Sequence, residues 1–251
     1  MMANLTHGLY RYAPLVLLAL AWEAAVRTGV ISELVLPRFS DALVSWWDLT
    51  TTGGMFEQAA HSLKRAVIGL GLAVALGTTA GILMAWNATI RVFVNPLIQM
   101  FYPMPKSALI PVMILWFGLG DASKIVTIFI GCLLPIVVSS FNGARGVEDV
   151  ILWSARSLGA TRRQLLWQII VPAAMPEILT GIRTALAISF VLLVSSEFII
   201  ARDGIGFMIS GFGDEGNYDR MFACIMTVVA MGFCADRIFQ LFMRRVLIWR
   251  E

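Results

Sequence analysis

Long apolar segments separated by short polar connections constrain this chain more than any other feature. Hydrophobic residues make up 59% of its 251 residues and charged residues only 14%, whereas soluble domains contain about 25% charged residues. Several apolar runs approach or exceed the roughly 18–20 residues that a helix needs to cross the hydrocarbon core of a bilayer. The sequence therefore predicts an all-α integral membrane protein built as one compact helical domain.

The hydropathy pattern predicts six membrane spans and one short amphipathic piece. The amphipathic piece, around Asp41–Leu49, carries two tryptophans that suit a membrane interface. The first apolar segment is expected to be a retained span, because no convincing signal-peptide cleavage site follows it. We expect residues 1–35 to form an N-terminal region with this span, and residues 36–251 to form the core domain with the other five. The predicted spans are about Ala13–Val30, Leu63–Trp86, Pro96–Phe117, Lys124–Phe141, Pro176–Ala201 and Arg220–Phe242.

Charge, cysteine and histidine content exclude several classes of function. The net charge of +3 is small and no dense basic face is present, so we expect no nucleic-acid partner. The three cysteines lie in apolar segments, and the two histidines lie near span ends. This arrangement predicts neither a disulfide framework nor a metal site. A GxxxxGK[ST] phosphate loop is missing, so we expect no ATP hydrolysis by this chain itself.

A polar, arginine-rich loop, about residues 145–175, separates the fourth and fifth apolar segments. Leu158, Leu165, Leu166 and Ile169 recur near helical spacing, which predicts an amphipathic helix that docks in a groove of a partner protein. A helix lying on anionic lipid is the alternative. Lys and Arg are densest in this loop and at the C-terminus, so both termini are expected on the cytoplasmic side.

Two features of the predicted spans concern packing and a pathway. Gly77 and Gly81 form a GxxxG pattern, which lets another helix approach closely. The third span contains Pro103, Pro105 and Pro111, which bend or break a helix. Broken backbone at membrane depth is tolerated only where it is buried in protein or lines a cavity. This span is therefore a candidate pathway-lining segment, and a simple packing kink is the alternative.

Three charged residues within or near the spans are further pathway candidates. Lys106 either lines the pathway or extends toward the cytoplasmic interface, and Arg183 is placed to line a cytoplasmic vestibule. Glu197 follows Ser195 and Ser196 near the outer end of its span. Its expected contact is either a basic group elsewhere in the chain or the substrate.

At the arginine-rich loop the sequence resembles a known family. The run ARSLGATRRQLLWQIIVPAAMPEILTGIRTAL is similar to the EAA loop of ABC importer permeases, in which a glycine follows E-A-A after three residues. Trp153 stands where that pattern has Glu, so no role of the Glu carries over. Other stretches are similar to the branch of sulfonate, taurine and nitrate permeases; they are Leu36–Leu43, Ser62–Trp86, Pro103–Ile125 and Arg202–Ile209.

The resemblance implies a type I importer fold in the bacterial inner membrane, with about six transmembrane helices. It implies two permease copies, a cytoplasmic ATPase dimer that binds ATP and Mg, and an extracytoplasmic substrate-binding protein. The loop would supply a coupling helix that docks on the ATPase through Trp153, Ser154, Ala155, Arg156, Ser157, Leu158, Gly159, Ala160, Arg162 and Arg163.

The implied cargo is a small sulfonate-like anion, selected largely by the separate binding protein. Asp203, Gly204 and Gly206 lie in a glycine-rich outer connection and are candidates for contact with that protein or for an outer gate. A plain solvated loop is the alternative there. A gradient-driven secondary transporter is the alternative for the whole chain, although such proteins usually show broken helices in both halves. An intramembrane enzyme would need a catalytic constellation that the sequence does not show.

Overall fold

The structure is a computed structural model that describes residues 2–199 and 201–250, with side chains placed for residues 13–199 and 201–249. All regular secondary structure in these residues is helical. The helices are α1 (Met2–Arg27), α2 (Phe39–Thr51), α3 (Met55–Trp86), α4 (Ala88–Phe101), α5 (Ile110–Phe117), α6 (Asp121–Arg145), α7 (Asp149–Ser157), α8 (Arg162–Gln164), α9 (Val171–Ile199), α10 (Ile205–Asp214) and α11 (Tyr218–Val246). Short 3-10 turns cover Lys106–Leu109 and Ile248–Arg250, and a π-helical segment covers Leu165–Ile170.

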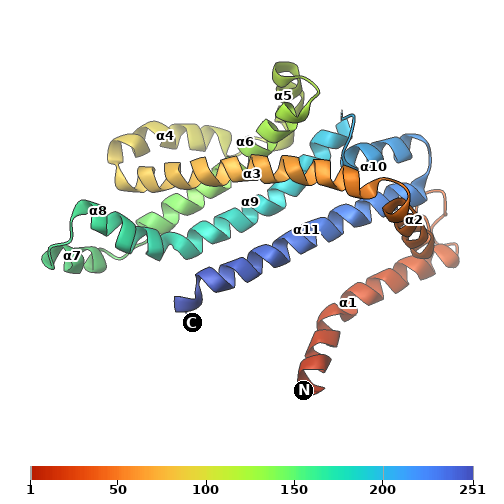
Figure 1. The fold of residues 1–251 in the computed structure, drawn as a ribbon, viewed down its shortest axis with the longest axis horizontal. Coiled ribbons are helices and arrows are strands. Elements are labelled where there is room, and N and C mark those ends of the chain that lie inside the picture. The colour runs from red at the N-terminus through yellow and green to blue at the C-terminus, as the bar shows by residue number, and fades with distance from the viewer. Residues whose placement is uncertain (1, 200, 251) are drawn as a thin grey trace.

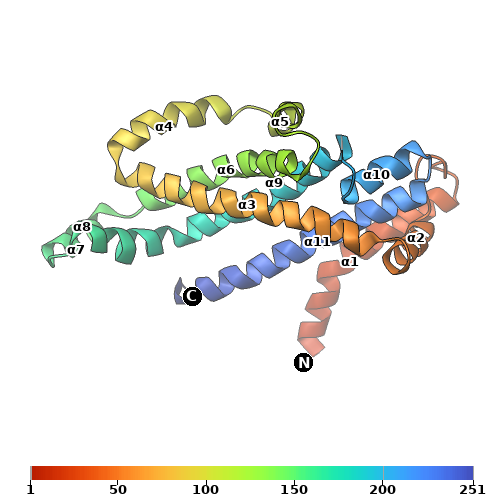
Figure 2. The same ribbon diagram turned by 45° about the horizontal axis from the view of Figure 1, so that its top comes forward.

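Three long helices form the centre of the molecule. The helix α6 packs along α3 on one side and along α9 on the other, and these are the two most extensive helix contacts. Figure 1 shows α7 and α8 at one end of this layer and α2 and α10 at the opposite end. In Figure 2, α4 lies on one side of the layer, and α11 and α1 lie on the other.

Glycines set the close contact between α3 and α6. A Cβ atom built on Gly77 would lie 3.0 Å from a side-chain carbon of Ile136, and one on Gly81 would lie 2.6 Å from the Cβ of Ser140. The predicted GxxxG contact is therefore confirmed, and α6 is its partner. Small residues at this spacing bring the two backbones together, so that van der Waals contact replaces contact with lipid.

Most of the predicted spans correspond to helices, and one of them is broken. The predicted third span is not one helix, because α4 and the segment Lys106–Phe117 meet at a 93° bend. Within the described residues, four helical segments (α3, α6, α8–α9 and α11) are long and apolar enough to cross a membrane, and the bent pair makes five. A sixth span at α1 remains a prediction. The fifth predicted span includes residue 200, which lies outside the described residues.

The N-terminal helix is attached at one end of the molecule. The Trp22 indole donates a hydrogen bond to the Pro37 carbonyl at 2.8 Å, and its ring packs edge-on against Phe39 of α2 and Phe222 of α11. The rest of α1 runs away from the central layer (Figure 1). The predicted amphipathic piece is confirmed as α2, which extends from Phe39 to Thr51.

We expect Gly81→Ala to destabilise the protein, because the new methyl group must push α3 and α6 apart. Overpacking of this kind costs about 1–3 kcal/mol, which thermal unfolding in detergent would detect as a lower midpoint. Gly71→Ala is the matched control, since it lies on the same helix and a Cβ there would meet nothing within 4 Å. Equal midpoints for the two variants would contradict the packing explanation.

Candidate functional site

The arginine-rich loop contains a separate short helix, α7, which ends in a glycine cap. Gly159 has a φ of +87°, a conformation that glycine adopts without steric cost. Its N–H donates to the Arg156 carbonyl at 2.9 Å, and the Ala160 N–H donates to the Ala155 carbonyl at 3.0 Å. This pair of bonds is the Schellman pattern that terminates helices. Gly159 is therefore explained by the end of α7.

The prediction of one amphipathic helix carrying Leu158, Leu165, Leu166 and Ile169 is wrong. A second helix begins after Thr161, whose hydroxyl accepts from the Gln164 N–H while the Gln164 side chain accepts from the Thr161 N–H. This reciprocal capping box fixes a new helix start. Leu158, the C-cap of α7, is 88% exposed, whereas Leu165, the first residue of the π segment, is buried. The two leucines therefore lie in different segments and different environments.

Large apolar side chains are exposed on one side of α7. Val150 and Trp153 are 64% and 61% exposed, and they lie three residues apart, on one face of the helix. Leu152 instead packs against the central hydrophobic core. The helix is thus fixed to the core on one side and presents large apolar side chains on the other. Arg156, Arg162 and Arg163 are exposed around it.

The broken span lies beside a cavity. The bend falls between Phe101 and Lys106, where Pro103 and Pro105 interrupt the helix. The Lys106 ammonium donates to the Tyr102 carbonyl at 2.6 Å, so it satisfies a backbone group at the break. A cavity of about 400 Å³ lies next to this bend. Its polar lining residues are Asn95, Gln99, Tyr102 and Asn142. Pro111 does not bend the chain; it lies in the first turn of α5.

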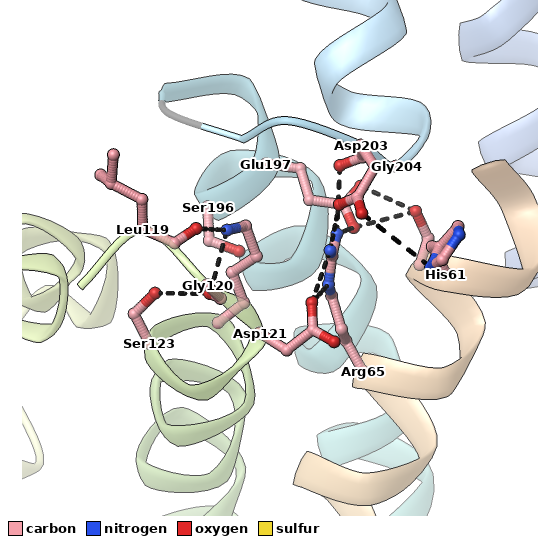
Figure 3. Close-up of polar contacts among 12 residues, drawn as sticks. His61, Arg65, Leu119, Gly120, Asp121, Ser123, Ser196, Glu197, Asp203 and Gly204 are labelled. Carbon is pink, nitrogen blue, oxygen red and sulfur yellow. Dashed lines mark hydrogen bonds and ion pairs between the residues drawn. The ribbon is translucent and has the colours of Figure 1, made fainter. Parts of the chain in front are cut away.

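At the opposite end from α7, an ion cluster with a buried centre and two partly exposed carboxylates, Asp121 and Asp203, joins α3, α6, α9 and the connection before α10 (Figure 3). Its centre is Arg65 of α3, which is 2% exposed. The guanidinium donates to Glu197 at 2.7 Å and to Asp121 at 2.8 Å, and it also pairs with Asp203. Glu197 is 1% exposed. One arginine therefore holds three carboxylates that come from three separate segments.

Glu197 also anchors the connection between α9 and α10. The Ser62 hydroxyl and the Gly206 N–H both donate to its carboxylate, at 2.8 and 3.0 Å. The Ile205 N–H donates to the Ser62 hydroxyl at 2.9 Å, and the Gly204 N–H donates to Gln58 at 2.6 Å. Backbone N–H groups that are buried need such partners. The start of α10 is thus fastened to both α3 and α9.

Hydrogen bonding to Arg65 lowers the pKa of the Asp203 carboxyl below its ordinary value. A lowered folded-state pKa means that this pairing stabilises the protein above the unfolded pKa of about 3.9. The stabilisation is lost only as the pH falls through the still lower folded value. Asp203 therefore stays ionised throughout the neutral range.

Comparison with known proteins assigns the chain to a family. Residues 77–248 match the model of the binding-protein-dependent transport system inner membrane component. The taurine transport system permease protein TauC of Escherichia coli (strain K12) is 33% identical over 240 residues, covering 94% of this chain and 87% of that protein. A putative aliphatic sulfonates transport permease, SsuC of Bacillus subtilis (strain 168), is 33% identical over 238 residues, covering 95% and 86%.

The chain belongs to the binding-protein-dependent transport permeases. It is a permease subunit of an ABC importer, a multi-pass protein of the inner membrane. Its fold resembles the methionine ABC transporter MetNI in inward-facing conformations, with a TM-score of 0.65 at 17% identity, covering 78% of this chain and 98% of that one. This likeness confirms the predicted type I transmembrane fold.

The pathway candidates of this permease do not gather at one place. Glu197 lies in the ion cluster, where it pairs with a basic group, one of the two contacts expected for it. Ser196 is buried beside it and donates to the Leu193 carbonyl, and Ser195 is half-buried. Lys106 lies at the broken span. Arg183 pairs with Asp236 of α11, away from both.

Sequence reasoning missed the central arginine of the cluster, its partner Asp121, and Ser62, which donates to Glu197. Arg65, Ser62 and Asp121 received no role, although Ser62 and Arg65 lie on the same helix face as Gly69. The sequence did contain a signal for Arg65. A charged residue within a stripe of small residues is expected to be buried, because such a stripe packs against another helix. The identity of the partners depends on the fold.

We expect Arg65→Met to destabilise the protein, because it leaves buried Glu197 without its cation. Removing one member of a buried ion pair lowers the free energy of unfolding by about 3–5 kcal/mol, which thermal unfolding in detergent would detect as a lower midpoint. Lys64→Met is the control, since Lys64 is the exposed neighbour on α3. The double variant Arg65→Met/Glu197→Gln should recover part of the loss. A double variant no better than Arg65→Met would contradict this explanation.

Proposed function

We propose that this permease works as a pair of identical copies on a cytoplasmic ATPase dimer, and that α7 is the helix docking on each ATPase subunit. The exposed apolar face of α7 is the observation that carries the proposal. Val150 and Trp153 are large, exposed apolar residues, and α7, the helix that carries them, lies at one end of the molecule in Figure 1. An amphipathic helix inserted into a groove is a common mode of protein recognition.

The connections of α7 suit it to transmit motion. Only three residues separate it from the end of α6, and its Leu152 packs against the core that α6 and α9 share. After the Gly159 turn, the chain runs through α8 and the π segment directly into α9. A displacement of α7 by the ATPase would therefore act on both central helices. Swinging a two-state equilibrium almost completely needs about 5.5 kcal/mol of differential binding, which ATP and Mg bound to the partner would supply.

This arrangement also orients the chain. If α7 meets a cytoplasmic ATPase, then the C-terminal end of α11, which lies toward the same end in Figure 1, is cytoplasmic. The ion cluster of Arg65 is then on the outer side, where a substrate-binding protein would dock. The N–H groups of Gly204 and Gly206 are already bonded inside the protein. Contact with the binding protein would therefore fall to exposed neighbours on α10, such as Phe207.

The proposed cargo is a small organic sulfonate, and taurine is the leading candidate. The support is the similarity to permeases named for taurine and for aliphatic sulfonates, at 33% identity each. A formylaminopyrimidine transport permease of Halalkalibacterium halodurans is also similar, at 26% identity. The separate binding protein would make most of the selection, and ATP hydrolysis would take place in the ATPase subunit.

We expect Val150→Ala/Trp153→Ala to uncouple transport. Core positions of an interface contribute at least about 2 kcal/mol each when they are hot spots, so ATP-driven taurine uptake into proteoliposomes containing the whole complex should fall at least about tenfold. Trp47→Ala is the matched control, because Trp47 is 66% exposed and lies on α2 at the opposite end. Retention of the ATPase during purification is measured in parallel. Full uptake by the double variant would refute the docking role of α7.

A further inference from the structure

A second ion pair, separate from the cluster of Arg65, joins two membrane helices partway along their length. Arg183 of α9 donates through Nε and Nη2 to the two carboxylate oxygens of Asp236 of α11, at 2.7 and 3.1 Å. Both helices belong to segments long and apolar enough to cross a membrane. The contact is bidentate, which is the geometry in which a guanidinium binds two oxygens of one anionic group.

The pair is open to its surroundings. The side chain of Arg183 is 47% exposed and that of Asp236 is 34% exposed. Charged groups facing hydrocarbon are expensive, and in membrane proteins they face the interior or a water-filled cavity. This side of α9 is therefore expected to face water or protein rather than lipid tails.

The exposed residues around Arg183 on α9 support the same conclusion. Between residues 173 and 187 they follow one helical stripe and are small or polar, and the exposed residues further along the helix, from Val191, are large and apolar. The exposed apolar residues of α11 are large, as is typical of a lipid-facing surface. The α9 stripe comprises Ala173, Glu177, Thr180, Thr184 and Ala187, and the α11 residues include Val229, Phe233, Ile238 and Leu241. Arg183 lies at the edge of the polar stripe.

The charges near the pair do not balance. Arg237 follows Asp236 on α11 and stacks on the Phe233 ring at 4.8 Å. Its Nε is buried, and within the part of the chain that the structure describes it has no hydrogen-bond partner. Two arginines thus lie near one carboxylate, which pairs with only one of them. Gln240 also donates to Asp236, so this carboxylate keeps a donor when Arg183 turns elsewhere.

From these observations we propose that Arg183 is a transit site for the transported anion, and that Asp236 occupies the guanidinium when no anion is present. The fork of Arg183 matches two oxygens of a sulfonate as well as it matches a carboxylate. An arriving sulfonate would displace Asp236, which then relies on Gln240. When the sulfonate leaves, Asp236 returns to Arg183. The inference deepens the proposed function and rests on it for the class of anion.

Chemical modification of Arg183 tests this site without any transport assay. The purified permease–ATPase complex is treated with phenylglyoxal, which reacts with accessible arginine side chains, and mass spectrometry follows the peptide containing Arg183. Methanesulfonate should protect Arg183, whereas the uncharged methanesulfonamide should not. In Asp236→Asn the internal competitor is gone, so protection should occur at a methanesulfonate concentration lower by about tenfold or more. Absence of protection in the unsubstituted protein would overturn the proposal.

Transport separates an anion site from a purely structural ion pair. A structural pair predicts that Arg183→Gln and Asp236→Asn are equally harmful and that the double variant recovers, because no charge is left unpaired. The anion site predicts that Arg183→Gln and the double variant both lose taurine uptake, while thermal unfolding shows that the double variant is folded. Recovery of uptake by the double variant would refute the site. Protection of Arg183 without any uptake of sulfonates by the unsubstituted complex would instead refute the proposed cargo and leave the anion site standing.

Discussion

The structure depends on the close contact of α6 with α3 and α9. Gly77 and Gly81 let α3 approach α6 until backbone and side-chain atoms are in direct contact. In a membrane, this contact must provide the attraction that the hydrophobic effect provides in water. Gly181 of α9 makes the equivalent approach to Ser139 of α6. Three helices held this closely form a rigid layer to which the other segments attach.

The two ends of that layer carry different interactions. At one end, α7 presents apolar side chains outward and connects through short segments to α6 and α9. At the other end, Arg65 binds carboxylates of α6, α9 and the connection before α10, with almost no exposure of its own. Breaking such a network leaves unpaired buried charge. The end that holds Arg65 is thus fastened, while the opposite end presents exposed apolar side chains of α7.

Much of this architecture could be predicted from the sequence. The apolar runs predicted the long helices, the GxxxG pattern predicted a close helix contact, and the loop motif predicted the family. The ion cluster could not be predicted, because Arg65 and Glu197 are separated by 132 residues, and only the packing of α3 against α9 brings them together. The extent of α7 was also missed, since a glycine cap and a threonine cap override the continuous apolar spacing. The bend at Pro103 and Pro105 was anticipated as a broken helix, but its 93° angle depends on tertiary packing.

Native mass spectrometry of the complex extracted in mild detergent tests the central claim most directly. The chain is produced together with the ATPase and carries an affinity tag, and the stoichiometry of the released complex is read from its mass. Two copies of this chain with two copies of the ATPase would agree with a permease pair coupled through α7. A chain that purifies without any ATPase, although α7 is intact, would contradict the coupling account.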